Sequence, residues 1–243
     1  MREVSNKVAL VFGGARGIGA AAVARLAKDG FAVAFTYVSR DDRAQALVTA
    51  VADSGGQAFA IKADSSDADQ IRDAVAKTVA TFGQIHTVVV NAGIFTIGTI
   101  DVVTVTQLDQ ILDINVRGVF LAIQAAAAQM TDGGRVITIG SNVVDRTGTP
   151  GASMYQFSKA AVASMVKGLA LDLAPRRITV NNVQPGPTNT DINAAYLEVL
   201  ADKSPLKRVA EPSEIAGLIA YIASAEAGYM TGASVTIDGG YTL

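Results

Sequence analysis

The sequence predicts an α/β fold with one doubly wound parallel sheet of seven strands and helices on both faces. Seven short apolar runs alternate along the chain with longer amphipathic stretches, as expected for successive right-handed βαβ units. Half of the residues are hydrophobic and 17% are charged, a balance typical of strands that helices cover on both sides. The length of 243 residues suits one large α/β domain. Since no linker, repeat or low-complexity tract interrupts the pattern, we expect residues 1–243 to form a single domain.

The apolar runs place the strands in order, and the amphipathic stretches place the helices between them. Strands are expected at residues 8–12, 31–38, 57–61, 87–90, 135–139, 178–183 and 234–237. The longer helices are expected at residues 18–28, 44–53, 67–81, 106–130 and 153–173. The stretch 185–196 is irregular; such a loop is often a mobile substrate lid, and a plain connection is the alternative.

Composition argues against several classes of function. A net charge of −2 disfavours nucleic acid or an anionic membrane as a partner. The chain has no cysteine, which excludes a disulfide framework or a thiolate metal site, and we expect no metal. Its single histidine, His86, precedes an apolar run and is expected to be a strand-edge residue without chemistry. No signal-peptide stretch and no uncharged apolar segment of transmembrane length occurs, so we expect a cytoplasmic protein.

A glycine-rich turn after the first expected strand predicts a phosphate-binding site. Residues 13–19 read Gly-Gly-Ala-Arg-Gly-Ile-Gly and open the first helix. Glycines let the backbone approach a pyrophosphate, and the free N–H groups of a helix N-terminus attract negative charge. The spacing of Gly13, Gly17 and Gly19 differs from the common G-x-G-x-x-G form. The order of strand, turn and helix nevertheless favours dinucleotide binding on a Rossmann-type sheet.

Three further loops are expected at the same crevice, because ligands of open parallel sheets bind outside the carboxyl ends of the strands. Asp64 follows the third strand, the sequence Asn-Ala-Gly at 91–93 follows the fourth, and Pro-Gly-Pro-Thr at 185–188 follows the sixth. Each of these could be an ordinary turn. Their joint placement is what indicates a site.

A candidate catalytic group follows the fifth strand. Tyr155 and Lys159 stand four residues apart, and therefore on one face of the helix expected at 153–173. Ser141 ends the fifth strand and shares the crevice. A lysine ammonium would lower the pKa of the tyrosine from about 10 by roughly 1–3 units, and Ser141 would fix a substrate oxygen against the phenol. This chemistry suits a carbonyl reductase or alcohol dehydrogenase with Tyr155 as proton donor.

Several elements occur together in one order: the glycine turn, residues 91–93, Asn115, Ser141, Tyr155, Lys159 and residues 185–186. In this combination the chain resembles the short-chain dehydrogenase/reductase family over residues 7–240. The resemblance implies a nicotinamide cofactor with Lys159 on its ribose, and an Asn115 that distorts its helix and helps a water connect Lys159 to solvent. One departure is Phe12, which stands where the family usually has a threonine that supports the turn.

The resemblance also implies a homotetramer, with subunit contacts through the helices expected at 106–130 and 153–173. Ala122 and the alanines at 125–128 would let helices of two subunits approach closely, and close packing within one chain is the alternative.

The sequence at the end of the second strand favours NADP(H) as the cofactor. NAD(H) is the alternative. A site selective for NAD usually places an acid about 20 residues after the glycine turn, whereas residues 37–40 read Tyr-Val-Ser-Arg. Asp41 and Asp42 come later and suit the first turn of the next helix, where negative charge favours the helix dipole. Arg16 and Arg40 are available for a 2′-phosphate, which a guanidinium binds through two parallel hydrogen bonds; the alternative is two solvated arginines.

Together these arguments define three sets of expected site residues. The catalytic set is Asn115, Ser141, Tyr155 and Lys159. The cofactor set is Gly13, Ala15, Arg16, Gly17, Ile18, Gly19, Tyr37, Ser39, Arg40, Asp64, Ser65, Asn91, Ala92, Gly93, Tyr155, Lys159, Pro185, Gly186 and Thr188. An apolar substrate pocket, suited to aryl or alkyl ketones and β-keto esters, is expected from Ile94, Phe95, Val143, Met154, Pro187 and Tyr196.

Two functions remain open within the family. The chain is similar to 3-oxoacyl-acyl-carrier-protein reductases and bacterial ketone reductases, which reduce a small-molecule carbonyl substrate. Residues 89–94, 184–187 and 236–239 are also similar to the cyclic-di-GMP-binding biofilm-dispersal oxidoreductases. A nucleotide-sensing protein on a reductase fold is therefore the rival hypothesis. The complete catalytic set favours the enzyme, because a pure sensor would not need it.

Overall fold

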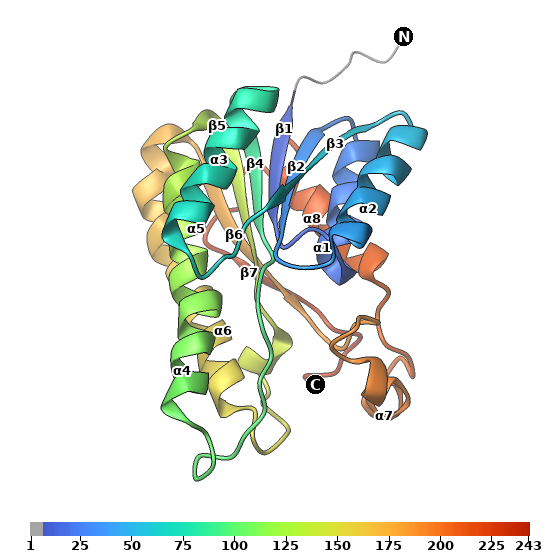
Figure 1. The fold of residues 1–243 in the computed structure, drawn as a ribbon. Coiled ribbons are helices and arrows are strands. Elements are labelled where there is room, and N and C mark those ends of the chain that lie inside the picture. The colour runs from blue at the N-terminus through green and yellow to red at the C-terminus, as the bar shows by residue number, and fades with distance from the viewer. Residues whose placement is uncertain (1–6) are drawn as a thin grey trace.

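A computed structural model describes residues 7–243. Residues 1–6, which belong to the stretch expected to lack a signal peptide, lie outside this description. Seven parallel strands form one sheet in the order β3-β2-β1-β4-β5-β6-β7, as the sequence predicts (Figure 1). The strands are β1 (Val8–Phe12), β2 (Ala32–Tyr37), β3 (Gln57–Lys62), β4 (Ile85–Val90), β5 (Met130–Ile139), β6 (Thr179–Pro185) and β7 (Ser234–Ile237).

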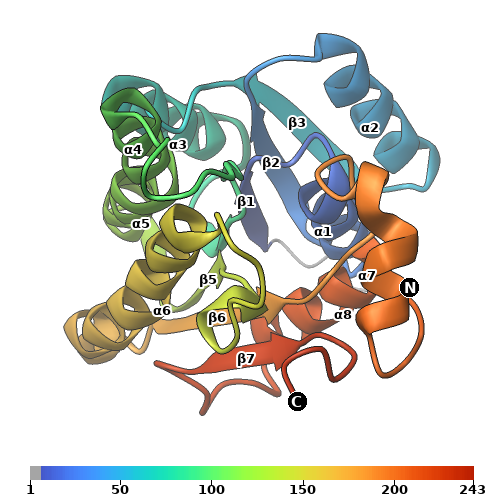
Figure 2. The ribbon, with the colours of Figure 1, turned by 90° about the horizontal axis from the view of Figure 1, so that it is seen from below.

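Helices cover both faces of the sheet (Figure 2). On one face lie α1 (Gly17–Lys28), α2 (Asp41–Asp53) and α8 (Pro212–Ala223), and on the other lie α3 (Ala68–Phe82), α5 (Gly118–Ala127) and α6 (Ser153–Leu173). Successive side chains of a strand point to opposite faces. Along β1, Leu10 and Phe12 therefore pack in one core cluster, and Ala9 and Val11 pack in the other. Burial on both sides is why this strand is apolar throughout.

The helix expected at 106–130 is interrupted and ends earlier. It consists of α4 (Val105–Leu112), a π-helical turn (Asp113–Arg117) and α5. Met130 already belongs to β5, where it pairs with Ile85 ahead of a register shift, so the expected helix end is wrong. The Met130 side chain is buried in the same core cluster as α3 and α5. This tertiary packing overrides the helix propensity of the alanine-rich segment.

Most of the alanines expected to form subunit contacts are buried within the chain itself. Ala122, Ala126 and Ala127 are buried, and the first two pack in the core cluster against the sheet. For these residues the alternative, close packing within one chain, is what the structure shows.

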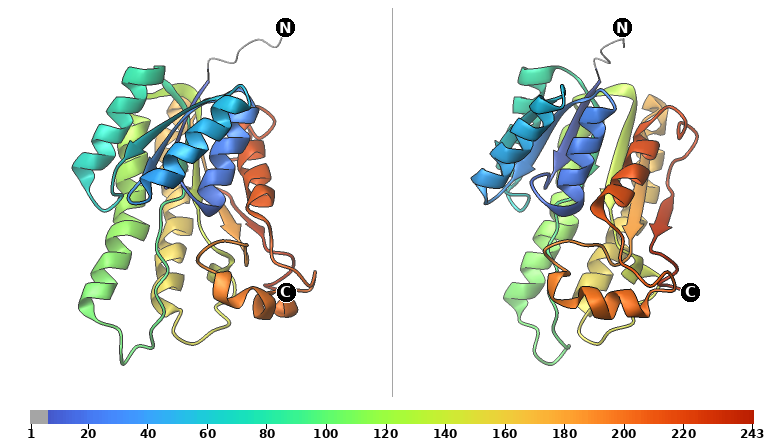
Figure 3. Two further views of the ribbon diagram at one scale, coloured as in Figure 1. Left: turned by 45° about the vertical axis from the view of Figure 1, so that its right-hand side comes forward. Right: turned by 90° about the vertical axis from the view of Figure 1, so that its right-hand side faces the viewer.

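The segment between β6 and α8 extends beyond the carboxyl ends of the strands (Figure 3). Pro185 still belongs to β6, and the remainder contains a 3₁₀ turn (Ala194–Tyr196) and α7 (Leu197–Lys203). We call residues 189–208 the lid.

At the opposite end of the sheet, His86 Nδ1 accepts a hydrogen bond from the backbone N–H of Val8 at 3.1 Å, so this histidine is remote from the carboxyl ends of the strands. In residues 7–243, no helix combines the length and apolar character that crossing a membrane requires.

Candidate functional site

A cavity of about 590 Å³ opens at the carboxyl ends of β1, β2, β3 and β4. The strand order reverses between β1 and β4, and ligands of doubly wound sheets bind at such a point. Figure 2 looks onto this end of the sheet. Most of the expected cofactor residues line the cavity: Gly13, Ala15, Arg16, Gly17, Ile18, Tyr37, Ser39, Arg40, Asp64, Ser65, Asn91, Ala92 and Gly93.

The glycine turn fits a dinucleotide phosphate. A Cβ at Gly19 would collide with the Gly13 carbonyl and lie 2.7 Å from Asn91 Nδ2. The first turn of α1 can therefore lie this close to Gly13 only if residue 19 is glycine. Arg16 at the N-cap of α1 provides no side-chain hydrogen bond, and the first turn contains no acid. The N–H groups at this helix end are therefore available to an anion, whose charge the helix dipole favours.

The missing threonine at position 12 is replaced by a residue of another strand. Thr36 of β2 accepts a hydrogen bond from the Gly13 N–H through its Oγ1 at 3.0 Å. Asn91 completes the support by donating from Nδ2 to the Gly13 carbonyl at 2.7 Å. Sequence reasoning did not identify Thr36, because only the pairing of β1 with β2 brings it beside the turn.

Several expected residues do not line the cavity, and some unexpected ones do. Thr188 is buried and donates its hydroxyl to the Gly186 carbonyl at 2.9 Å. Thr190 lines the cavity instead, and a Cβ at Gly17 would lie 3.1 Å from its methyl carbon. Gly19, Tyr155, Lys159, Pro185, Gly186 and Thr188 are outside the lining. The lining residues that the sequence did not reveal are Thr36, Val38, Arg43, Ala63, Gln110, Ile114, Thr190, Asp191 and Ile192.

The expected catalytic residues gather at the start of α6. Lys159 is 4% exposed, and its Nζ lies 5.7 Å from the centroid of the Tyr155 ring. The same Nζ donates to the carbonyl of Ile139 at the end of β5, at 2.8 Å. Ser141, two residues further on, shares a hydrogen bond with the Tyr155 side chain. Phe95 packs edge-on against the Tyr155 ring, with centroids 4.8 Å apart.

Burial controls the protonation of this group. It raises the pKa of the Tyr155 phenol above its usual value of 10.0, and the hydrogen bond with Ser141 opposes that rise. Burial also lowers the pKa of Lys159 from 10.5 to about 8. The expected lowering of the tyrosine pKa by lysine is therefore wrong. Desolvation disfavours the charged forms of both side chains, and it is the largest influence on the pKa of each.

Asn115 connects the π turn to the catalytic helix. Its fully buried Oδ1 accepts from the Ile94 N–H at 2.8 Å, and its Nδ2 donates to the Ile94 carbonyl at 2.9 Å and to Ser158 Oγ at 3.1 Å. A Cβ at Gly93 would lie 3.3 Å from Asn115 Oδ1 and 3.4 Å from Lys159 Nζ, so these three residues meet. The π turn agrees with the helix distortion that the resemblance implies. Ser158, a further buried contact, had no signal in the sequence.

The expected substrate residues are divided. Only Ile94 lines the cavity. Val143 and Met154 are buried next to Ser141 and Tyr155 along the chain, whereas Tyr196 is 57% exposed in the lid. The Pro187 carbonyl accepts a hydrogen bond from the Ala210 N–H at the base of the lid.

Three arginines line the cavity, one at the N-cap of α1 and two at the start of α2. Arg40 binds the Asp42 carboxylate through two hydrogen bonds of 3.0 and 2.8 Å, which lower the pKa of Asp42 to about 2. Arg43 donates to Asp191 of the lid at 2.6 Å. Asp41 and Asp42 lie in the first turn of α2, as expected. We call Arg16, Arg40 and Arg43 the arginine corner.

Comparisons with known proteins agree with this architecture. Residues 13–242 match the family model described as enoyl-(acyl carrier protein) reductase. The chain is 40% identical over 244 residues to the cyclic-di-GMP-binding biofilm dispersal mediator protein of Escherichia coli, covering 99% of each. It is 48% identical to a short-chain dehydrogenase/reductase of Serratia marcescens, with a TM-score of 0.96 and 99% of each chain covered. It is also 42% identical to a short-chain dehydrogenase of Burkholderia cenocepacia in complex with NADP, with a TM-score of 0.95 and 99% of each chain covered.

Proposed function

The chain belongs to the short-chain dehydrogenase/reductase family, and we propose that it is an NADP(H)-dependent enzyme that reduces a ketone or aldehyde to an alcohol. The observation that carries this proposal is that Ser141 and Lys159 both lie against Tyr155, while Lys159 also reaches Gly93 in the lining of the cavity. A proton donor, a hydrogen-bonding hydroxyl and a cation at the edge of a dinucleotide-sized cavity suit carbonyl reduction.

The cofactor would be held by the N–H groups of the glycine turn, by residues 91–93 and by the arginine corner, which suits a 2′-phosphate. When bound, the nicotinamide supplies the hydride for the carbonyl carbon. The complex of the Burkholderia cenocepacia relative with NADP supports this choice. The absence of an acid at residues 37–40 supports it as well, because no carboxylate there repels a phosphate.

Tyr155 donates the proton to the carbonyl oxygen. Its raised pKa keeps the phenol protonated at neutral pH, which is the form that a donor needs. Ser141 hydrogen-bonds the phenol and holds the substrate oxygen against it. Lys159 binds the ribose side of the cofactor, next to Asn115 and Gly93. The apolar surface of Ile94 and Phe95 suits aryl or alkyl ketones and 3-oxoacyl groups.

The test is the oxidation of NADPH and of NADH in the presence of a panel of ketones, aldehydes and β-keto esters. We expect turnover with at least one carbonyl compound and a higher kcat/KM for NADPH. The double variant Arg16→Ala with Arg40→Ala should lose this preference. Equal or better use of NADH by the unmodified enzyme would contradict the choice of cofactor, and no turnover across the panel would contradict the reductase.

A second candidate function is the binding of cyclic-di-GMP by a regulatory protein on a reductase fold. The observation that favours it is the 40% identity to the Escherichia coli biofilm dispersal mediator protein. Titration with cyclic-di-GMP beside NADPH separates the two functions. Saturable cyclic-di-GMP binding without carbonyl turnover would establish the regulatory protein, and turnover without cyclic-di-GMP binding would establish the enzyme.

A further inference from the structure

A carboxylate of the lid contacts the arginine corner. Asp191 Oδ2 lies 2.6 Å from Arg43 Nη1 and 3.8 Å from Arg16 Nη1. Arg16 belongs to the glycine turn and Arg43 to α2, so one lid side chain contacts the two elements that line this corner. The three side chains are 39–55% exposed, and a ligand in the cavity can therefore reach them.

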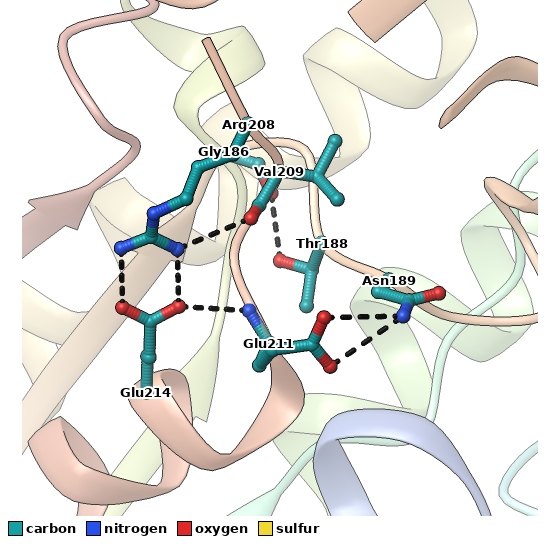
Figure 4. A network of polar contacts seen from close by, with 7 residues as sticks. All are labelled: Gly186, Thr188, Asn189, Arg208, Val209, Glu211 and Glu214. Atoms are coloured by element: carbon teal, nitrogen blue, oxygen red, sulfur yellow. Dashed lines mark hydrogen bonds and ion pairs between the residues drawn. The ribbon is translucent and has the colours of Figure 1, made fainter. Parts of the chain in front are cut away.

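The base of the lid is held separately from this contact. The Asn189 N–H donates to the Ala210 carbonyl at 2.8 Å. The Asn189 amide reaches the Glu211 carboxylate at 3.2 Å, and Arg208 binds Glu214 through hydrogen bonds of 2.6 and 2.7 Å (Figure 4). None of these bonds involves Arg16, Arg43 or Asp191. Loss of the Asp191 contact would thus release the lid from the arginine corner while its base stays in place.

Building on the proposed use of NADP(H), we propose that Asp191 competes with the 2′-phosphate of the cofactor for Arg43 and Arg16. Binding of the phosphate then releases the lid from the arginine corner. A phosphate presents more negative charge and more acceptor oxygens than one carboxylate, so it displaces the carboxylate from a shared guanidinium. Arg40 takes no direct part in this competition, because its guanidinium pairs with Asp42 and not with Asp191. The inference adds Arg43 to the phosphate contacts.

The charge state of Asp191 agrees with this role. The hydrogen bond from Arg43 lowers the pKa of Asp191 below its usual range, and the positive charges of Arg43, Arg16 and Arg40 lower it further. Asp191 is thus ionised at neutral pH and competes as an anion. Ion pairs this exposed contribute little to stability, so the contact is easily exchanged.

The test uses 2′,5′-ADP, which carries the 2′-phosphate and lacks the nicotinamide, with 5′-AMP as the probe without that phosphate. Isothermal titration of the full chain should show that Asp191→Asn binds 2′,5′-ADP about two- to fivefold more tightly, the range expected for loss of one exposed ion pair. Arg43→Gln should bind it more weakly. Neither substitution should change the affinity for 5′-AMP.

Asp202→Asn is the matched control. Asp202 lies in the same lid and pairs with Lys207 at 3.3 Å, so the substitution removes an equal charge without touching the arginine corner. Equal tightening by Asp191→Asn and Asp202→Asn would show an effect of net charge and overturn the inference. Unchanged affinity of Asp191→Asn, or failure of the wild type to bind 2′,5′-ADP, would also overturn it. If one of these results overturns the inference but the protein still reduces a carbonyl compound, the proposed function is unaffected.

Release of the lid can be measured directly, because the chain contains no cysteine. A single cysteine introduced at Val199, which is exposed in α7, accepts one fluorescent label. Addition of 2′,5′-ADP should change the emission of the labelled Val199→Cys protein, whereas 5′-AMP should not. Asp191→Asn in the same background should give most of that change without ligand. Identical emission in all of these states would overturn the release of the lid.

Discussion

Replacement of Lys159 by methionine should stabilise the fold and remove activity. Lys159 is 4% exposed, and burial lowers its pKa from 10.5 to about 8. The folded protein therefore bears a desolvation penalty for the ammonium that the unfolded chain does not. Methionine retains an unbranched side chain and removes the charge. The same substitution removes the group proposed to bind the cofactor ribose.

The size of the effect follows from the pKa shift. A difference of about 2.5 units between 10.5 and about 8 corresponds to about 3 kcal/mol in the free energy of unfolding. The Ile139 carbonyl loses its hydrogen-bond partner in the variant, which offsets about 1–3 kcal/mol of this gain. The offset does not depend on pH. The penalty of the lysine does, and it is the quantity to measure.

The sign of the pH dependence can be stated for each range. Below pH 8 the lysine is charged in both states and the penalty is complete. Between about pH 8 and 10.5 the folded protein loses the proton while the unfolded chain keeps it, so the stability of the wild type rises relative to the variant. From pH 7 to pH 10 the advantage of Lys159→Met should therefore shrink by about 2 kcal/mol.

The assay is urea unfolding of both proteins at pH 7 and pH 10, at one protein concentration. Lys167→Met is the control, because Lys167 is exposed on the same helix. Its stability relative to the wild type should not change with pH. A Lys159→Met advantage that is the same at both pH values, or a change equal to that of Lys167→Met, would refute the argument from burial.

Three further predictions concern the site and the assembly. Tyr155→Phe should lower kcat by about 10²–10⁴-fold, because phenylalanine keeps the ring but has no proton to donate. The affinity for NADPH, measured in parallel, should be nearly unchanged. Retention of more than a tenth of the activity would contradict the role of Tyr155 as proton donor. Gly19→Ala should abolish NADPH binding in a fluorescence titration, because the added Cβ collides with the Gly13 carbonyl and displaces the turn; normal affinity in a folded variant would disprove the fit. Light scattering should give four times the chain mass of 25.0 kDa, and a monomer at working concentration would remove the proposed homotetramer.

The sequence by itself determined the features that depend on local pattern. The strands were predictable because a strand buried on both faces must be apolar at successive positions, as β1 is. The glycine turn was predictable because close backbone contact between the turn and α1 admits only glycine at position 19. The spacing of Tyr155 and Lys159 fixed their shared helix face, since residues four apart are neighbours on a helix.

Only the tertiary structure decided the features that depend on distant segments or on burial. Thr36 supports the glycine turn because β2 pairs with β1, and Asp191 meets Arg43 across 148 positions of sequence. The direction of the Tyr155 pKa shift was not predictable, because it depends on how completely the fold desolvates the phenol and the lysine. The pattern of apolar and polar residues along the sequence predicts which side chains are buried. It does not predict which charged or hydroxyl groups from distant segments contact those side chains in the folded protein. Those contacts are fixed by how the strands pair and the loops cross at the carboxyl end of the sheet.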